Sequence, residues 1–137
     1  MSKNWCKDIA KMHEKFGFHE KIAEFDKETL YEMLLFRYRF LEEEMKEIEA
    51  AIESGNSEEI VDGLIDLCVV SIGTLDLFQV DAEKAWNQVH RANMKKRRGI
   101  KESRPNPSGL PDLMKPKGWK GPSHEDNHGL LTKVEDI

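Results

Sequence analysis

The sequence predicts an all-α protein, a four-helix-type bundle followed by an irregular C-terminal tail. Two observations lead to this fold class. Before residue 95, apolar residues recur at steps of three and four in four separate segments, which is the periodicity of a helix with one buried face. Residues 102–137 are instead dense in proline and glycine, which is typical of turns and extended chain. We therefore expect one helical domain over residues 1–101 and a tail over residues 102–137 that packs on the same domain or on a neighbouring subunit.

The composition supports a single globular domain. The 137 residues are 39% hydrophobic and 34% charged, which is typical of a folded helical chain. The net charge of −5 argues against a nucleic-acid coat, so we do not expect nucleic acid as a partner. Asp66 and Asp76 interrupt the longest apolar stretch, and the first residues lack an apolar signal segment, so we expect no membrane association. Cys6 and Cys68 form no C-x-x-C pair, which predicts reduced thiols in a cytoplasmic protein.

The first two predicted helices are separated by a break at residues 16–18. Residues 4–16 form a short helix by their spacing of apolar side chains. A longer helix follows Asp26 and extends from about residue 27 to 53, roughly 40 Å at 1.5 Å per residue. Its apolar stripe consists of Leu30, Leu34, Tyr38, Leu41, Met45, Ile48 and Ile52.

The third predicted helix, from about residue 58 to 78, has apolar side chains on nearly every side. Gly55 suits a left-handed position after the preceding helix, and Asn56 or Ser57 can cap the new one. A helix that is apolar all round must be buried all round, and four helices of one chain cannot surround it. We therefore expect a homo-oligomer, either a dimer or a tetramer, to complete the bundle.

The fourth predicted helix follows Asp81 and runs into the basic segment KKRRG. Its buried stripe consists of Ala82, Ala85, Trp86, Val89 and Ala92. At its end, Asn93 and Lys96 are three residues apart and Arg97 is four residues after Asn93, so a continuous helix would place all three on one face. Alternatively, Lys95, Arg97 and Arg98 form a basic last turn that complements the helix dipole.

Acidic residues on the second and third helices form the main candidate site. Glu47 lies three residues after Glu44 and four after Glu43, so these three share a helix face. Asp62 and Asp66 are likewise four residues apart on the next helix. The tight break between the helices predicts that they are antiparallel. The two acidic groups then lie at similar heights, within about one turn.

Asp66 is the most informative of these residues, because it is embedded in an otherwise apolar segment. A buried carboxylate without a partner costs several kcal/mol. Facing carboxylates also repel one another unless divalent ions lie between them, and oxygen-only ligation suits Mg²⁺ or Mn²⁺.

Simpler interpretations of the acids remain open. Asp66 could pair with Arg37 or Arg39, and Glu42, Glu49 and Glu53 are expected on a solvated face. A di-iron bundle is a weaker rival, because it requires paired E-x-x-H motifs. The sequence has one such motif, Glu125–His128, in the tail.

The segments FRYRFLEEEMKE and EEIVDGLIDLCVVSIGTL resemble the all-α nucleoside triphosphate pyrophosphohydrolases, the superfamily of MazG and phosphoribosyl-ATP pyrophosphatase. Its hallmark is E-E-x-x-E on one helix, matched by Glu43, Glu44 and Glu47, and an acidic pair, usually E-x-x-D, on the next. Asp66 matches the final Asp, but Gly63 stands where the first acid belongs. Asp62, one position earlier, matches the D-x-x-x-D variant of short MazG-like proteins, and Glu59 is the alternative fourth ligand.

Three further motifs extend the resemblance over nearly the whole chain in the same order: MHEKFG at residues 12–17, V-x-x-x-N-x-x-K ending at Lys96, and KPKGW at residues 115–119. The set is most similar to MazG proteins of tailed bacteriophages, which implies a bacterial or phage-infected cytoplasm.

The resemblance implies an Mg²⁺-dependent hydrolase, with Mn²⁺ as a possible substitute, that cleaves the α–β phosphoanhydride of a nucleotide to monophosphate and pyrophosphate. The implied metal ligands are Glu44, Glu47, Asp62 and Asp66, and the implied catalytic residues are Glu43, Glu44 and Glu47, with Glu43 orienting or deprotonating the attacking water. The implied nucleotide contacts are Asn93, Lys96, Arg97, Lys115, Trp119 and His13. Trp119 is expected to stack on a base or to pin the tail to a neighbouring subunit, and His13 is expected to be structural or a minor pocket residue.

Two non-enzymatic functions remain as alternatives. One is a helical interaction module that contacts nucleic acid through its basic run, residues 95–101. The other is an acidic bundle that binds metal without hydrolysis. Deoxynucleotides, ribonucleotides, modified nucleotides and alarmones all remain open as substrates.

Overall fold

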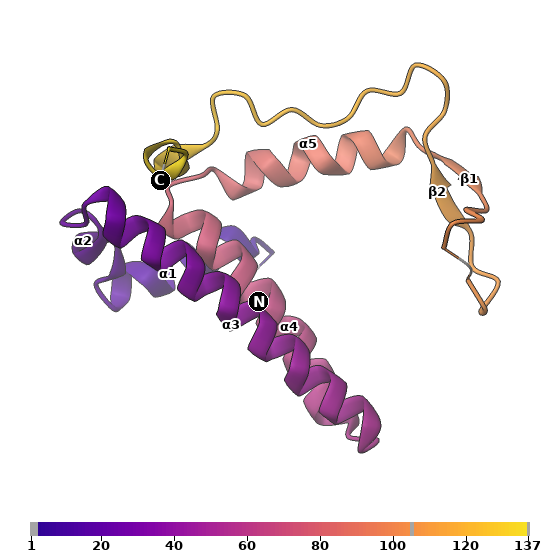
Figure 1. Cartoon of the computed structure of the whole chain (residues 1–137), viewed down its shortest axis with the longest axis horizontal. Helices are drawn as coiled ribbons and strands as arrows, with labels where there is room; N and C mark the ends of the chain where they lie inside the picture. The colour runs from indigo at the N-terminus through magenta and orange to yellow at the C-terminus, as the bar shows by residue number, and fades with distance from the viewer. Residues whose placement is uncertain (1–2, 105, 137) are drawn as a thin grey trace. The chain divides into compact units, whose positions relative to one another are not determined.

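The computed structural model describes residues 3–104 and 106–136, and the elements of secondary structure are predominantly helical, which confirms the all-α prediction (Figure 1). The chain divides into two compact units. The first consists of residues 1–82 with residues 127–137, and the second of residues 83–126. The domain boundary expected at residue 101 stays a prediction. Among the described residues, no helix combines the length and apolar character needed to span a bilayer.

The longest element of the first unit is α3, Lys27–Glu53, which has the predicted bounds. Asp26 caps it, because the backbone N–H of Thr29 donates to the Asp26 carboxylate at 2.8 Å. Hydrogen bonding to the side chain of Thr29, and then to its backbone N–H, lowers the pKa of Asp26. The cap fixes where the helix begins and therefore which residues of α3 face α4.

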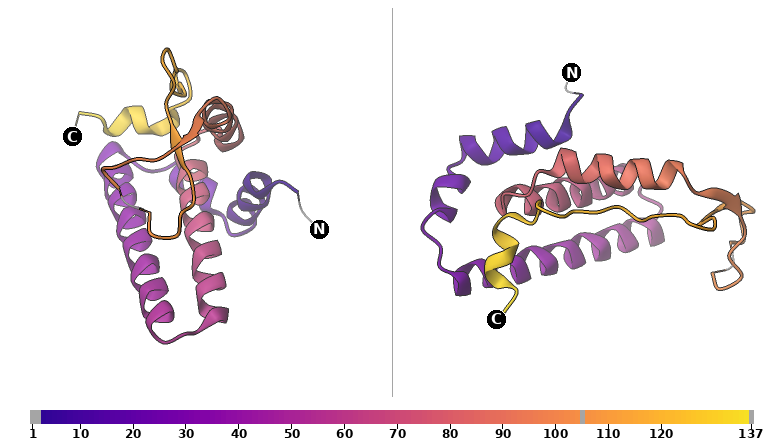
Figure 2. Two further views of the ribbon diagram at one scale, coloured as in Figure 1. Left: turned by 90° about the vertical axis from the view of Figure 1, so that its right-hand side faces the viewer. Right: turned by 90° about the horizontal axis from the view of Figure 1, so that it is seen from above.

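Helix α4, Ser57–Leu77, runs antiparallel to α3 after a tight turn, as predicted (Figure 2). Gly55 adopts the left-handed conformation, with a φ of 66°, that ends the preceding helix. The side chain of Asn56 accepts a hydrogen bond from the N–H of Glu59 at 3.1 Å and is therefore the N-cap. The two helices form a hairpin that presents its acidic residues at matching heights.

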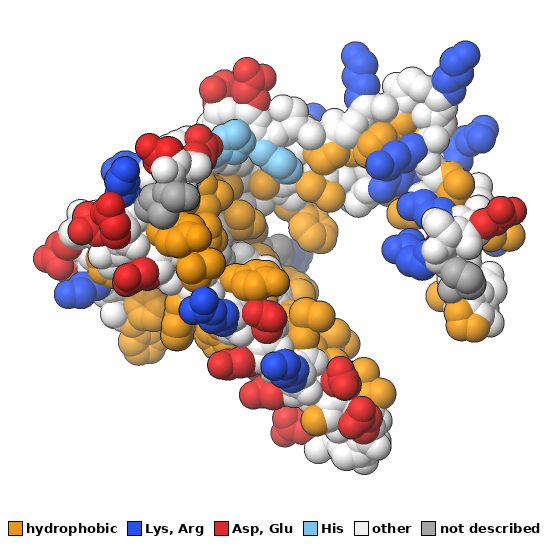
Figure 3. Space-filling view, in the orientation of Figure 1, with side chains coloured by type: hydrophobic (Ala, Val, Ile, Leu, Met, Phe, Trp, Pro, Cys, Tyr) orange, Lys and Arg blue, Asp and Glu red, His pale blue; other side chains and the backbone are white. Residues whose placement is uncertain are grey.

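Apolar side chains remain exposed on this hairpin, although α4 was expected to be buried on all sides. Val61, Leu64 and Ile65 of α4 are 64%, 51% and 46% exposed, and Met45 and Ile52 of α3 are both 60% exposed. Figure 3 shows hydrophobic and acidic side chains interspersed along the arm that α3 and α4 form. One chain alone does not bury α4, and the expected oligomer stays a prediction.

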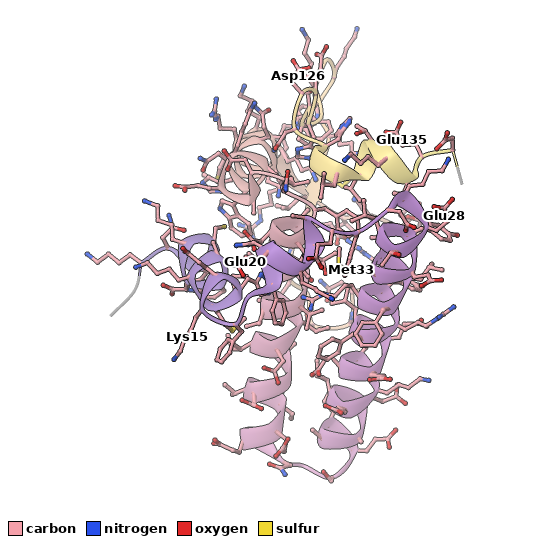
Figure 4. All side chains as sticks on the ribbon, turned by 90° about the vertical axis from the view of Figure 1, so that its left-hand side faces the viewer. Lys15, Glu20, Glu28, Met33, Asp126 and Glu135 are labelled. Carbon is pink, nitrogen blue, oxygen red and sulfur yellow. The ribbon has the colours of Figure 1, made fainter. Side chains whose placement is uncertain are left out.

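Helix α1, Trp5–Lys15, is followed by a short helix α2, Phe18–Ile22. Gly17 separates them with a φ of +75°, a conformation that a side chain would strain. Figure 4 shows Lys15 and Glu20 on the two sides of this break. Helix α2 is not predictable from the sequence, because five residues are too few to show a helical period.

The core of the first unit lies where α2, the start of α3 and the end of α4 meet the C-terminal 3₁₀ helix η1, Gly129–Val134. Leu30 and Phe78 are its most completely buried apolar residues. The side chain of Asn127 ties the C-terminal segment down, since it accepts from the N–H of Asp81 at 2.8 Å and donates to its carbonyl at 2.9 Å. The end of the tail is thus folded into the helical unit.

The second unit contains α5, Ala82–Met94, except for its first residue. It also contains a two-stranded antiparallel sheet of β1, Arg97–Gly99, and β2, Asp112–Met114. The helix ends at Met94, so the prediction that Arg97 continues its face was wrong. Within the tail predicted over residues 102–137, β2 is a short regular element that the sequence did not indicate, because three residues leave no readable alternation. The carboxylate of Asp112 accepts from the N–H of Lys101 at 2.8 Å, which lowers its pKa and closes the hairpin loop.

Candidate active site

The hairpin of α3 and α4 brings the predicted acids around Glu44. This side chain is buried, with 8% of its surface exposed, whereas Glu43 and Glu47 on the same helix are exposed. From α4, Asp62 is exposed and Asp66 is half-buried. We call these five residues the acidic cluster. It places one buried carboxylate among four others that reach toward solvent.

The electrostatics of Glu44 show that the four neighbours act on it. Burial raises the pKa of Glu44, and the charges of Glu47, Asp66, Asp62 and Glu43 raise it further, in that order. Its Oε2 atom is buried and has no hydrogen-bond partner among the described residues. A buried, unpartnered carboxylate oxygen facing other carboxylates is a costly arrangement for a folded protein to keep.

A divalent cation is the group that this arrangement fits. The donors are all carboxylate oxygens, which are the ligands that Mg²⁺ and Mn²⁺ prefer. The orphaned Oε2 of Glu44 supplies a preformed acceptor, and the neighbouring acids supply the negative charge that a 2+ ion offsets. The assignment of individual ligands stays a prediction.

The alternative that Asp66 pairs with an arginine has no support. Arg37 instead donates its Nε to the hydroxyl of Thr74 at 3.0 Å and its Nη2 to the carbonyl of Val70 at 3.1 Å, and burial lowers its pKa. In residues 3–104 and 106–136, neither Arg37 nor Arg39 forms an ion pair with Asp66.

Gly63 occupies the position at which the E-x-x-D form would carry an acid, and the structure gives a reason for the departure. Gly63 is buried against α3, and a Cβ atom there would lie 2.6 Å from Cγ1 of Ile48. No side chain fits at this position while Ile48 keeps its place. Asp62, one residue earlier, is exposed and acts on Glu44 from the same turn of α4.

His13 lies elsewhere in the first unit. Only 2% of its surface is exposed, and its Nδ1 atom lies 2.7 Å from Oδ2 of Asp76. His19 contacts the same oxygen through Nε2, also at 2.7 Å. The contact between His19 and Asp76 leaves no signal in the sequence, because 57 residues separate them and neither belongs to a motif. A nucleotide contact of His13 stays a prediction.

Three of the predicted substrate residues come together in the second unit. The indole N–H of Trp119 donates to the carbonyl of Ala92 at 2.8 Å, and the ammonium groups of Lys96 and Lys115 lie 5.2 and 5.3 Å from its ring centroid. These are cation–π distances. Trp119 thus pins residues 115–119 to α5 of its own chain. Asn93 is exposed near the end of α5, and Arg97 belongs to β1.

Comparison with protein families gives a match to the phosphoribosyl-ATP pyrophosphohydrolase family over residues 10–93. The match covers more than half of the chain and includes both acid-bearing helices. The chain belongs to this family. The phosphoribosyl-ATP pyrophosphohydrolase family shares its all-α superfamily with MazG, which confirms the resemblance found in the sequence. The comparison with curated proteins finds no match.

Membership of the phosphoribosyl-ATP pyrophosphohydrolase family supports a nucleotide pyrophosphohydrolase activity in general, a hydrolysis of acid anhydrides. The family is typically metal-dependent, in agreement with the donor set around Glu44. The closer similarity to phage MazG proteins stays a prediction.

Proposed function

We propose that this chain is an Mg²⁺-dependent nucleotide pyrophosphohydrolase that cleaves the α–β phosphoanhydride of nucleoside or deoxynucleoside triphosphates. The products are nucleoside monophosphate and pyrophosphate. The observation that carries the proposal is the buried carboxylate of Glu44, which has an unpartnered oxygen and is surrounded by four acids of two helices. A triphosphate cannot approach such a cluster without a cation between them.

Four residues hold the cation in this proposal. Glu44 supplies its buried oxygen, Glu47 lies one turn further along α3, and Asp62 and Asp66 supply carboxylates from α4. When bound, Mg²⁺ neutralises the facing acids and phosphate oxygens and withdraws electron density from phosphorus.

Glu43 acts on the water that attacks. It is exposed beside Glu44, so its carboxylate can accept a hydrogen bond from a water molecule and then take its proton. The water oxygen forms a bond to the α-phosphorus while the bond from that phosphorus to the bridging oxygen breaks. Pyrophosphate leaves with the bonding electron pair. In the alternative arrangement Glu43 and Glu44 exchange roles, with Glu44 as the base and Glu43 at the cation.

Lys96, Lys115 and Trp119 are the proposed contacts to the nucleotide, together with Asn93 and Arg97. Ammonium groups suit phosphate oxygens, and an indole ring suits a base. The mutual contact of the first three supports a joint role. Replacing Lys96 with alanine should raise KM more than it lowers kcat, as expected for a residue that contributes binding in both ground and transition states.

We also propose that the active form is a homo-oligomer, a dimer or a tetramer, whose contact covers the exposed stripe of Val61, Leu64 and Ile65. Their i, i+3, i+4 spacing forms one continuous apolar strip on α4. Light scattering should give a multiple of the 15.9 kDa chain mass, and Leu64→Glu should reduce it. A monomeric wild-type protein would contradict this part of the proposal.

Pyrophosphate release from a panel of nucleotides tests the activity. We expect release from at least one triphosphate with Mg²⁺ and none with EDTA. Glu47→Gln and Asp66→Asn should abolish it, and Glu43→Gln should lower kcat by about 10²- to 10⁴-fold. Glu49→Gln is the matched control, because Glu49 is exposed on α3 outside the cluster and should retain activity. A folded wild-type protein that binds Mg²⁺ or shifts DNA mobility without hydrolysing any nucleotide would favour the non-catalytic alternatives.

A further inference from the structure

Three helices of the first unit converge at a second group of ligand atoms. His13 comes from α1, His19 from α2 and Asp76 from the last turn of α4, and their ligand atoms all lie within 4.8 Å of one another. Asp76 lies ten residues after Asp66 on α4, about 15 Å along the helix axis. The trio is therefore separate from the acidic cluster, and it has a different donor set, two imidazole nitrogens and one carboxylate oxygen.

The break between α1 and α2 creates this group. On a continuous helix, six residues of separation would point His13 and His19 in directions about 120° apart. The left-handed Gly17 folds the chain so that both rings reach the same oxygen, Oδ2 of Asp76, each at 2.7 Å. The rings stand at 87° to each other with their centroids 6.0 Å apart, and two nitrogens thus approach one point from different directions.

The surroundings hold His13 in place. Phe18 stacks on its ring at 4.8 Å and 12°. On α4, Gly73 leaves room for the ring, since a Cβ atom there would lie 3.2 Å from Cε1 of His13. A ligand whose orientation is fixed by packing loses little entropy when an ion binds.

The group is closed on one side and open on the other. His13 is 2% exposed, whereas the side chains of Asp76 and His19 are 20% and 41% exposed. The exposed side provides an entry path and room for a water molecule as a further ligand. Three protein ligands with one open position form a familiar type of zinc site.

We propose that His13, His19 and Asp76 bind a borderline divalent transition-metal ion, with Zn²⁺ as the preferred occupant. Imidazole nitrogen and carboxylate oxygen together suit Zn²⁺ better than Mg²⁺. Bonds of about 2.0–2.1 Å in a tetrahedral site place ligand atoms about 3.3 Å apart. The two 2.7 Å contacts then need to lengthen by only about 0.6 Å each, a shift that the partly exposed side chains of Asp76 and His19 can supply. Bound metal would join α1 and α2 to the end of α4.

Co²⁺ titration of the full chain tests this proposal. Co²⁺ in a tetrahedral site with nitrogen ligands gives strong visible d–d absorption. Co²⁺ in a six-coordinate carboxylate site absorbs much more weakly. Excess Mg²⁺ keeps Co²⁺ away from the acidic cluster. His19→Ala and Asp76→Asn are the test variants, both at partly exposed positions. His90→Ala, which removes an exposed histidine of α5, and Glu47→Gln, which alters the acidic cluster, are the controls.

We expect one equivalent of Co²⁺ per chain, displaced by Zn²⁺, with affinity at least tenfold weaker in both test variants and unchanged in both controls. Zn²⁺ at a hundredfold excess over Kd should raise the Tm of the wild-type protein by roughly 5–10 °C and that of His19→Ala much less. Absence of the visible bands in the wild-type protein, or equal affinity in His19→Ala, would overturn the proposal. Because the readouts are absorption and Tm, failure here leaves the proposed hydrolysis unaffected.

Discussion

Replacing Glu44 with glutamine should stabilise the metal-free protein, although it removes a central residue of the proposed active site. Glu44 is 8% exposed, and its Oε2 has no hydrogen-bond partner in the described part of the chain. Burial is the largest cause of its raised pKa, and the charges of four neighbouring acids raise the pKa further. Glutamine has nearly the same shape, carries no charge and offers an amide N–H₂ that can donate to the neighbouring carboxylates.

The size of the effect follows from the cost of an unsatisfied buried group. Such a group costs about 1–3 kcal/mol, and more when charged. Glutamine keeps one carbonyl oxygen in the same place, so part of the cost remains. We expect the unfolding free energy of Glu44→Gln to exceed that of the wild-type protein by about 1–2 kcal/mol at pH 7 without metal. For a chain of this size the corresponding rise in Tm is roughly 3–8 °C.

Urea denaturation at pH 7 measures this difference, once with EDTA and once with Mg²⁺. With EDTA, Glu44→Gln should be more stable than the wild-type protein. With Mg²⁺, the wild-type protein should gain stability through ligand binding, and the variant should gain much less. Glu49→Gln changes the same residue type on an exposed turn of α3 and should leave stability unchanged within about 0.5 kcal/mol. A destabilised Glu44→Gln protein in EDTA, or one indistinguishable from Glu49→Gln, would refute the reasoning.

Three further predictions concern pH, packing and the C-terminal segment. The pKa of Glu44 in the folded protein is raised above its ordinary value of 4.5, so the folded metal-free protein binds this proton more tightly than the unfolded chain does. The difference in unfolding free energy between Glu44→Gln and the wild-type protein should therefore close as pH falls from 7 toward 4.5. A difference that is independent of pH would contradict this. Gly63→Ala should destabilise by about 1–2 kcal/mol, which is the overpacking cost less the gain in helix propensity. Ile48→Ala, which removes the approaching Cγ1 atom, should cost less in the Gly63→Ala protein than in the wild-type protein in a denaturant double-mutant cycle; additive effects would count against the close approach. Asn127→Ala should lower the unfolding free energy by about 1–3 kcal/mol, because it removes two hydrogen bonds to the backbone of Asp81. Amide hydrogen exchange over residues 129–134 should become faster. Unchanged exchange would show that other contacts hold this segment.

The helices that carry the acidic cluster could be predicted from sequence, because their determinants are local. Asp26 caps α3, Gly55 and Asn56 end one helix and start the next, and the apolar period covers many turns. Antiparallel packing across a short turn then fixes the relative heights of the acids. These steps need no information from distant parts of the chain.

Other features could not be predicted, because they depend on contacts between distant segments. Asp76 joins His13 and His19 across 63 and 57 residues, and neither His19 nor Asp76 belongs to a motif. The role of Gly63 becomes visible only when Ile48 is seen opposite it. The strands of the second unit are three residues long, and Arg97 belongs to a strand because its segment pairs with that of Met114.

Mn²⁺ binding followed by electron paramagnetic resonance tests the central claim most directly, because free Mn²⁺ gives a six-line signal that weakens on binding. If carboxylates of α3 and α4 jointly hold the ion, Glu47→Gln and Asp66→Asn should each weaken Mn²⁺ binding at least tenfold, whereas Asp76→Asn and Glu49→Gln should bind as the wild-type protein does. Wild-type affinity in both Glu47→Gln and Asp66→Asn would show that the cluster is not the metal site.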